Sequence, residues 1–250
     1  MTPIQQLMLG VGASKKTYLD DVFHIQVHAG NSATRSINNG INLSSSGGLI
    51  WAKTRDVANS NHTLFDTVRG ATKYLSSSTT SAEATYTGNG ITSFNNNGYT
   101  LGDDSSWQGL NHSGNKYVLN TFRKAPGFFT IKQYTGTGSA QSISHDLGSI
   151  PGCIMIKRLD SSTSWKVYHR GTGAEKALAL DLTNSAVDSD NYWNDTEPTA
   201  SVFTVKANTH LNASGATYVA YLFAGGESTA ATARSVDFDG DDYLSLPVDS

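Results

Sequence analysis

Acidic and aromatic side chains gather in the stretch DSDNYWNDTEP, residues 188–198. Tyr192 and Trp193 are followed there by Asp195 and Glu197. Glycosidases use two carboxylates roughly 5–10 Å apart beside the sugar, and aromatic rings with polar neighbours can also bind sugars without cleaving them. Trp193 could equally pack into a hydrophobic core. We place core or loop packing first, ligand contact second and catalysis last.

A shorter stretch in the first half of the chain has the same character. In DDSSWQGLN, residues 103–111, two aspartates precede Trp107. Loops at one end of a β-module commonly carry binding residues. If these loops bind a ligand, the predicted contact residues are Trp107, Tyr192, Trp193 and Asp195. No catalytic residue is predicted.

One further pattern resembles a catalytic site but lacks its essential geometry. Ser144, His145 and Asp146 are adjacent in SISHDLG, whereas a catalytic triad converges from separate elements of the fold. The chain also has no G-x-S-x-G nucleophile elbow. We therefore expect this segment to be a turn that leads into the next strand.

Histidine, aspartate and cysteine patterns do not predict a metal or cofactor site. His24 and His28 would share one face of a strand, but no carboxylate with suitable spacing accompanies them. DFDGDD, residues 237–242, resembles a calcium loop without the closing Glu of an EF-hand. The sole cysteine, Cys153, lies in the apolar run GCIMIKR, so we expect it to be buried and inert.

Charge and hydropathy exclude several classes of protein. Only 16% of the 250 residues are charged and the net charge is −3, whereas a nucleic-acid-binding protein has a basic surface. No apolar segment is long enough to cross a membrane. The first residues are apolar without preceding basic residues, unlike a secretory signal. We expect an arm, residues 1–21, that is either flexible or ordered against a partner.

An internal repeat organises the rest of the chain. LNHSGNKYVLNTF (110–122) and LNASGATYVAYLF (211–223) share Leu, Asn, Ser, Gly, Tyr, Val and Phe at the same places. GLIWAKTRD (48–56) matches GCIMIKRLD (152–160) in the same way. The paired segments occur in the same order in both halves, roughly one hundred residues apart. The sequence therefore predicts two copies of one unit, residues 22–125 and 127–226, joined at KAPG.

The pattern within each copy is typical of strands. FTIKQYTG and TYVAYLFAG alternate polar with apolar or aromatic residues, and turn clusters such as SSSGG and TGTG separate the runs. Residues 64–75 and 170–182 could each hold a helical turn. The predicted fold is mainly β, with two tandem antiparallel β-sandwich modules that resemble jelly rolls, after an extended N-terminal arm.

Two family resemblances extend this interpretation. VDFDGDDYLSLP, near the end, resembles the first strand of concanavalin A-like, laminin G-type domains. LFDTVRGATKYL and SIPGCIMIKR, with the surrounding chain up to residue 226, resemble tail fibre or tail-associated virion proteins of marine bacteriophages. Residues 228–234 are expected to be a linker. The last strand either completes an earlier module or, as we favour, begins a laminin G-type domain of a longer chain.

The resemblance implies a structural role in a virion and no catalytic residues. It implies a homo-oligomer, most simply a trimer, attached to phage tail or baseplate proteins and presenting distal domains to a host surface glycan. The predicted partner-binding residues in the arm are Ile4, Leu7, Met8, Leu9 and Val11. The alternatives are a carbohydrate-binding module without a virion role and, less favoured, a polysaccharide depolymerase.

Overall fold

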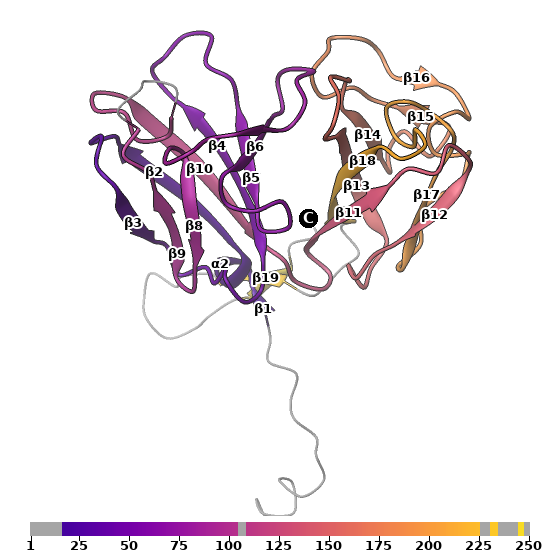
Figure 1. The fold of residues 1–250 in the computed structure, drawn as a ribbon. Helices are drawn as coiled ribbons and strands as arrows, with labels where there is room; N and C mark the ends of the chain where they lie inside the picture. The colour runs from indigo at the N-terminus through magenta and orange to yellow at the C-terminus, as the bar shows by residue number, and fades with distance from the viewer. Residues whose placement is uncertain (1–16, 105–108, 226–230, 235–244, 248–250) are drawn as a thin grey trace, which may run out of the picture.

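The computed structural model describes residues 17–104, 109–225, 231–234 and 245–247. The predicted mainly β fold with two antiparallel modules is confirmed (Figure 1). The predicted contacts of the arm at Ile4, Leu7, Met8, Leu9 and Val11 lie outside the described residues, as do Trp107 and the DFDGDD segment.

Module 1 consists of a larger and a smaller antiparallel sheet. The larger sheet has the order β2 (Phe23–Ala29), β10 (Lys116–Arg123), β4 (Gly48–Thr54), β5 (Thr63–Asp66), β6 (Lys73–Ser76), β7 (Ala84–Thr85). The smaller sheet has the order β3 (Arg35–Asn38), β9 (Gly98–Leu101), β8 (Ile91–Asn95). Apolar residues of both sheets, among them Phe65, Tyr99 and Leu119, form one buried core. Alternate residues of each strand point into this core.

Module 2 repeats the arrangement with fewer strands. Its larger sheet has the order β11 (Phe129–Thr135), β18 (Thr217–Ala224), β13 (Pro151–Arg158), β14 (Lys166–His169). Two pairs complete it, β12 (Gln141–Ser144) with β17 (Val202–Val205) and β15 (Lys176–Ala177) with β16 (Val187–Asp188). The order β2-β10-β4-β5 therefore recurs as β11-β18-β13-β14, which is the structural form of the repeat.

The shared L-N-x-S-G-x-x-Y pattern has the same structural role in both modules. Asn111 and Asn212 are fully buried, and each bonds the backbone of the loop that follows β2 or β11. Gly114 and Gly215 have φ of 90° and 74°, a conformation that favours glycine. The recurring tyrosine, Tyr218 in module 2, accepts a hydrogen bond from a backbone N–H of this turn. The repeated residues thus fix a turn that joins three segments of the module.

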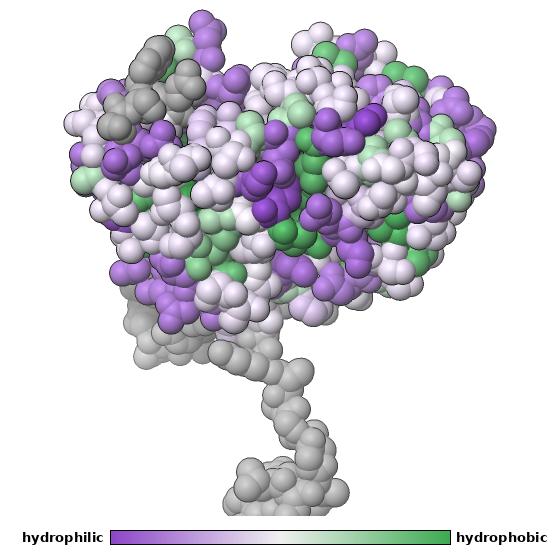
Figure 2. Space-filling view, viewed as in Figure 1, coloured by the Kyte–Doolittle hydropathy of each residue, from purple (hydrophilic) through white to green (hydrophobic). Residues whose placement is uncertain are grey.

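The outer faces of the two larger sheets pack against each other. We call the apolar residues there the inter-module core, and it consists of Leu49, Leu64, Leu75, Phe129, Ile131, Met155, Leu159, Trp165, Val167, Val219 and Tyr221. Figure 2 shows hydrophobic residues along the seam between the modules. Since burial of one such side chain contributes about 1.5–3 kcal/mol, this contact makes the two modules one body.

A buried polar network crosses the inter-module core. The Tyr221 hydroxyl donates to Asp66 Oδ2 (2.7 Å) and accepts from Arg69 Nη2 (3.2 Å). Arg69 also pairs with the carboxylate of Asp66, and both side chains are almost fully buried. Nearby, Lys157 Nζ donates across the interface to the carbonyl of Thr80 (3.0 Å). The hydrogen bonds of Tyr221 and Lys157 favour one relative placement of the modules, because another placement would break them.

The chain enters and leaves the body at one place. β1 (Thr17–Tyr18) pairs in parallel with β19 (Ala231–Arg234), and β19 pairs with β20 (Ser245–Pro247). The short helix α2 (Leu19–Val22) follows β1, and Val22 is buried against Ala125. The last residues of the predicted arm thus belong to the body. The segment predicted to be a linker, residues 228–234, contains strand β19. Its small side chains do not prevent a strand, because strands pair through their backbones.

The two segments in which helical turns were considered consist of strands and turns. Residues 64–75 cover parts of β5 and β6, joined by a turn in which Gly70 N donates to Asp66 O (3.1 Å). This is a single helical-type hydrogen bond that does not continue. In the described residues α2 is the only helix, and no helix there is long and apolar enough to span a membrane.

Candidate functional site

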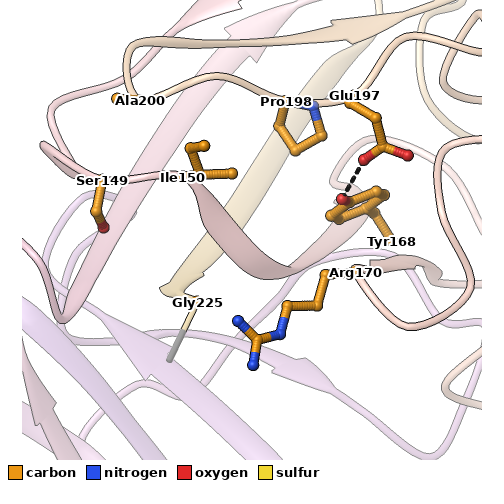
Figure 3. A pocket seen from close by; sticks show the side chains of 8 residues that line it. All are labelled: Ser149, Ile150, Tyr168, Arg170, Glu197, Pro198, Ala200 and Gly225. Carbon is orange, nitrogen blue, oxygen red and sulfur yellow. Dashed lines mark hydrogen bonds between the residues drawn. The ribbon is translucent and has the colours of Figure 1, made fainter. Parts of the chain in front are cut away.

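A pocket of about 510 Å³ opens on module 2, beside the end of β18 (Figure 3). It lies where three segments meet: the start of β13, the turn after β14 and the chain that leads to β17. Its lining residues are Ser149, Ile150, Tyr168, Arg170, Glu197, Pro198, Ala200 and Gly225. We call it the Glu197 pocket.

Glu197 holds one wall of this pocket in place. Its Oε2 accepts from the Tyr168 hydroxyl (2.5 Å) and its Oε1 accepts from Ala174 N–H (2.7 Å). Burial and this hydrogen bond raise the pKa of Tyr168 well above its usual value. The phenol therefore stays protonated at neutral pH, and the carboxylate serves first to position Tyr168.

Arg170 and Ile150 give the pocket its binding chemistry. The exposed Arg170 guanidinium has no carboxylate within ion-pair distance in the described part of the chain. Ile150 is 54% exposed, and Ser149 Oγ is buried without a hydrogen-bond partner among the described residues. A cation, an apolar surface and a buried hydroxyl can together hold a small ligand with a carboxylate or hydroxyl groups.

The predicted contact residues in 188–198 lie elsewhere. Trp193 is 2% exposed, and its Nε1 donates to the carbonyl of Lys176 (3.1 Å). The prediction that Trp193 contacts a ligand does not hold, because its ring packs edge-on against Tyr168 in the core of module 2. The alternative of core packing describes this residue.

Tyr192 and Asp195 do not line the Glu197 pocket either. Tyr192 is half-buried, and Lys166 Nζ lies 4.9 Å from the centre of its ring. Asp195 is exposed in a turn with a φ of 44°. Of the acidic and aromatic residues in this stretch, only Glu197 lines the pocket.

Among the residues that the structure describes, one carboxylate lines this pocket. It belongs to Glu197, whereas glycoside cleavage uses two. Asp190, in the same stretch as Glu197, is paired with Lys206.

The Ser144-His145-Asp146 segment is structural, as its sequence indicates. His145 Nε2 lies 3.2 Å from the carbonyl of Thr199, and Asp146 accepts from the Thr130 hydroxyl at 2.5 Å. These two side chains thus bond different segments of module 2. Among the described residues no group of three or more His, Cys, Asp and Glu side chains could hold a metal ion.

Sequence reasoning missed Tyr168, Arg170 and Ile150 as pocket residues. Tyr168 looks like any residue of an apolar strand, and the sequence allows a helical turn in residues 170–182. An exposed isoleucine directly before Pro151 and an arginine directly after a strand were the available signals. Neither shows on its own that the two residues meet.

Comparison with protein families agrees with the repeat. The family described as domain of unknown function DUF7483 matches residues 20–128 and again residues 121–232. Neither a curated protein nor a solved structure matches the chain. Since the two matches together span most of the chain, the protein belongs to the DUF7483 family and carries two consecutive copies of its domain.

Proposed function

We propose that this protein is a non-enzymatic structural component of a bacteriophage tail, a fibre or fibre adaptor. Its N-terminal arm attaches to tail or baseplate proteins, and its two modules project toward the host surface. The observation that carries the proposal is the pairing of β1 with β19 at one end of a two-module body. A body attached at a single place presents its opposite end outward.

The inter-module core supports a load-bearing role. Independent β-modules on a flexible linker would move relative to each other, whereas these modules share buried apolar residues and buried hydrogen bonds from Tyr221 to Asp66 and Arg69. A body of fixed shape transmits the position of its attached end to its distal loops. A tail fibre or fibre adaptor needs a fixed shape, whereas hydrolysis of a substrate does not.

Deletion of residues 1–16 tests the attachment. We expect virions assembled with the deleted chain to lack the protein by immunoblot, while the purified deletion variant keeps the circular dichroism spectrum and melting temperature of the full chain. Normal incorporation of the deletion variant into virions would refute the proposed role of the arm.

Light scattering tests the assembly. We propose that the chain forms a homo-oligomer, most simply a trimer, as the resemblance to tail fibres implies. A trimer of the full chain and of the deletion variant would support assembly through the modules. A monomer in both cases would refute self-assembly of this chain and favour an adaptor that binds as a single copy.

Carbohydrate binding without a virion role is the second candidate, and the Glu197 pocket favours it. An acidic sugar would place its carboxylate on Arg170. A depolymerase is the third, and it would release reducing ends from host polysaccharide. We expect no release by the wild type; release that is lost in Glu197→Gln would overturn the non-enzymatic proposal.

A further inference from the structure

A second pocket lies on module 1, at the end of the body opposite β1 and β19. Its volume is about 400 Å³, and it is formed by the end of β4, the loop 55–62, and the inner faces of β5 and β6. The loop after β4 lies at the end of module 1 away from β1 (Figure 1). The lining residues are Thr54, Val57, Ala58, Asn59, Ser60, Asn61, Thr63, Tyr74, Ser76, Tyr86 and Gly109. We call it the distal pocket.

The chemistry of the distal pocket is polar but uncharged. Among the described residues, its lining contains hydroxyl and amide side chains and two tyrosines, and no Asp, Glu, Lys, Arg or His. The Glu197 pocket, by contrast, has both an arginine and a glutamate. A charged ligand in the distal pocket would lose hydration without gaining an opposite charge, whereas a neutral ligand rich in hydroxyl groups would gain hydrogen bonds.

Thr63 is the buried polar group that a ligand would satisfy. It is 8% exposed, and its Oγ1 is buried without a hydrogen-bond partner among the described residues. On the strand pair, Thr63 lies opposite Ser76, and Phe65 lies opposite Tyr74. All four side chains therefore share the inner face of the sheet. An unpaired buried hydroxyl is unfavourable to folding, and a ligand that bonds it would remove that cost.

The walls of the distal pocket are held in place before a ligand arrives. The rings of Tyr74 and Tyr86 stack with centroids 3.9 Å apart and an interplanar angle of 10°. Asn61 Oδ1 accepts from Ser78 Oγ (3.1 Å), which in turn bonds Ser76 Oγ (3.2 Å). Because Asn61 Oδ1 accepts this hydrogen bond, the Asn61 amide nitrogen can donate to a ligand. Preorganised polar groups beside aromatic rings suit a sugar.

The corresponding strand and loop of module 2 make different contacts. Lys166 takes the strand position of Thr63, and its Nζ lies over the Tyr192 ring. The loop 159–165 corresponds to loop 55–62, but it bonds module 1 through Leu159 O and Thr163 N. Trp165 at its end is fully buried in the inter-module core. In module 2 this loop contacts module 1, whereas the corresponding loop of module 1 lines the distal pocket.

We propose that the distal pocket of module 1 binds a neutral sugar, with Thr63 and Asn61 as hydrogen-bonding residues. The inference goes beyond the structural role proposed above and does not depend on it, because a sugar can bind this pocket whether or not the chain is part of a virion. It also concerns a different ligand class from the Glu197 pocket, whose Arg170 suits an anion.

Saturation-transfer difference NMR on the full chain tests the proposal directly. The probes are glucose, galactose, mannose, N-acetylglucosamine and N-acetylgalactosamine, with glucuronic acid and glucosamine as charged counterparts of glucose. At sugar concentrations above about 10 mM, the pocket is largely occupied if the Kd is in the low millimolar range. We expect at least one neutral sugar to bind, and glucuronic acid and glucosamine to bind at least about tenfold more weakly than that sugar. Absence of binding by all the neutral sugars, or equal binding of the charged ones, would overturn the proposal.

Matched variants assign the binding to the pocket. Thr63→Val keeps the side-chain shape and removes the hydroxyl, and Asn61→Ala alters an exposed loop residue. We expect each to weaken sugar binding about tenfold or more, as loss of a hydrogen bond to a buried group does. Thr79→Val is the control, since Thr79 Oγ1 is also buried and unpartnered among the described residues but does not line the pocket. Unchanged binding in both Thr63→Val and Asn61→Ala would overturn the assignment.

Two further measurements separate this result from other causes. Thr63→Val should melt no lower than the wild type, because it removes an unsatisfied hydroxyl, so that loss of binding cannot be ascribed to unfolding. Arg170→Ala alters the Glu197 pocket and should leave binding of neutral sugars unchanged. Loss of neutral-sugar binding in Arg170→Ala would place the sugar in the Glu197 pocket and refute the distal site.

Discussion

The Tyr221→Phe substitution tests whether the two modules form one cooperative unit. Tyr221 is fully buried on β18 of module 2, yet its hydroxyl bonds Asp66 and Arg69 of module 1. The substitution keeps the ring in place and removes only the oxygen. Asp66 then loses one donor and Arg69 loses one acceptor, and both side chains are almost fully buried.

The expected cost follows from the charges involved. A hydrogen bond to a charged group contributes about 1.5–3 kcal/mol, against about 1 kcal/mol for a neutral pair. Because two charged partners share one hydroxyl, we expect Tyr221→Phe to lower the free energy of unfolding by about 3 kcal/mol. The control is Tyr134→Phe, which removes a hydroxyl that donates to the neutral carbonyl of Leu211 at 2.7 Å. Its expected cost is about 1 kcal/mol.

Urea denaturation, followed by both circular dichroism and tryptophan fluorescence, measures these costs. The wild type should unfold in one transition, with both signals coincident, because the inter-module core unfolds with each module. Tyr221→Phe should shift that single transition as a whole. Two resolved transitions in the wild type, or a cost of Tyr221→Phe no larger than that of Tyr134→Phe, would refute the reasoning.

Three further predictions concern other buried groups. Burial lowers the pKa of the Lys157 ammonium from 10.5 to about 8, so between these pH values the folded chain binds fewer protons than the unfolded chain. The wild type should therefore gain stability relative to Lys157→Met as pH rises from about 8 to 10. Urea denaturation measures this gain, and an unchanged stability difference across that range would show that the ammonium is hydrated. Burial raises the pKa of the Cys153 thiol to about 11, so iodoacetamide at pH 8 should label the native chain far more slowly than the chain in urea, and equal rates would contradict its burial. Asn212→Ala removes the partner of Thr137 N, Gln141 Nε2 and Ser139 O and should cost about 3 kcal/mol or more in the same denaturation assay, with Asn208→Ala, in the preceding turn, as the milder comparison.

The repeat could be predicted from sequence because its signature residues act locally. Asn111 and Asn212 bond loops of their own module, and Gly114 and Gly215 take a conformation that few other residues adopt. Such requirements hold wherever the module sits, so the pattern recurs in both copies. The mainly β fold follows from the same local patterns.

The inter-module core could not be predicted, since it depends on which outer face another module covers. Ile25 and Ile131 occupy the same place in the two copies, but Ile25 is 54% exposed and Ile131 is 3% exposed. An apolar residue on a strand does not reveal whether it faces its own module or a neighbour. The Glu197 pocket was missed for the related reason that its residues come from three separate segments.

The parallel pairing of β1 with β19 has a mechanical consequence. Thr17 and Ala231 are direct backbone partners, so tension that pulls the chain apart at these two residues acts first on a short ribbon of hydrogen bonds. The sheets of both modules lie outside that path and carry force only after the ribbon has separated. We therefore expect the β1–β19 pairing to break first under tension, so that the chain lengthens before either β-sandwich unfolds.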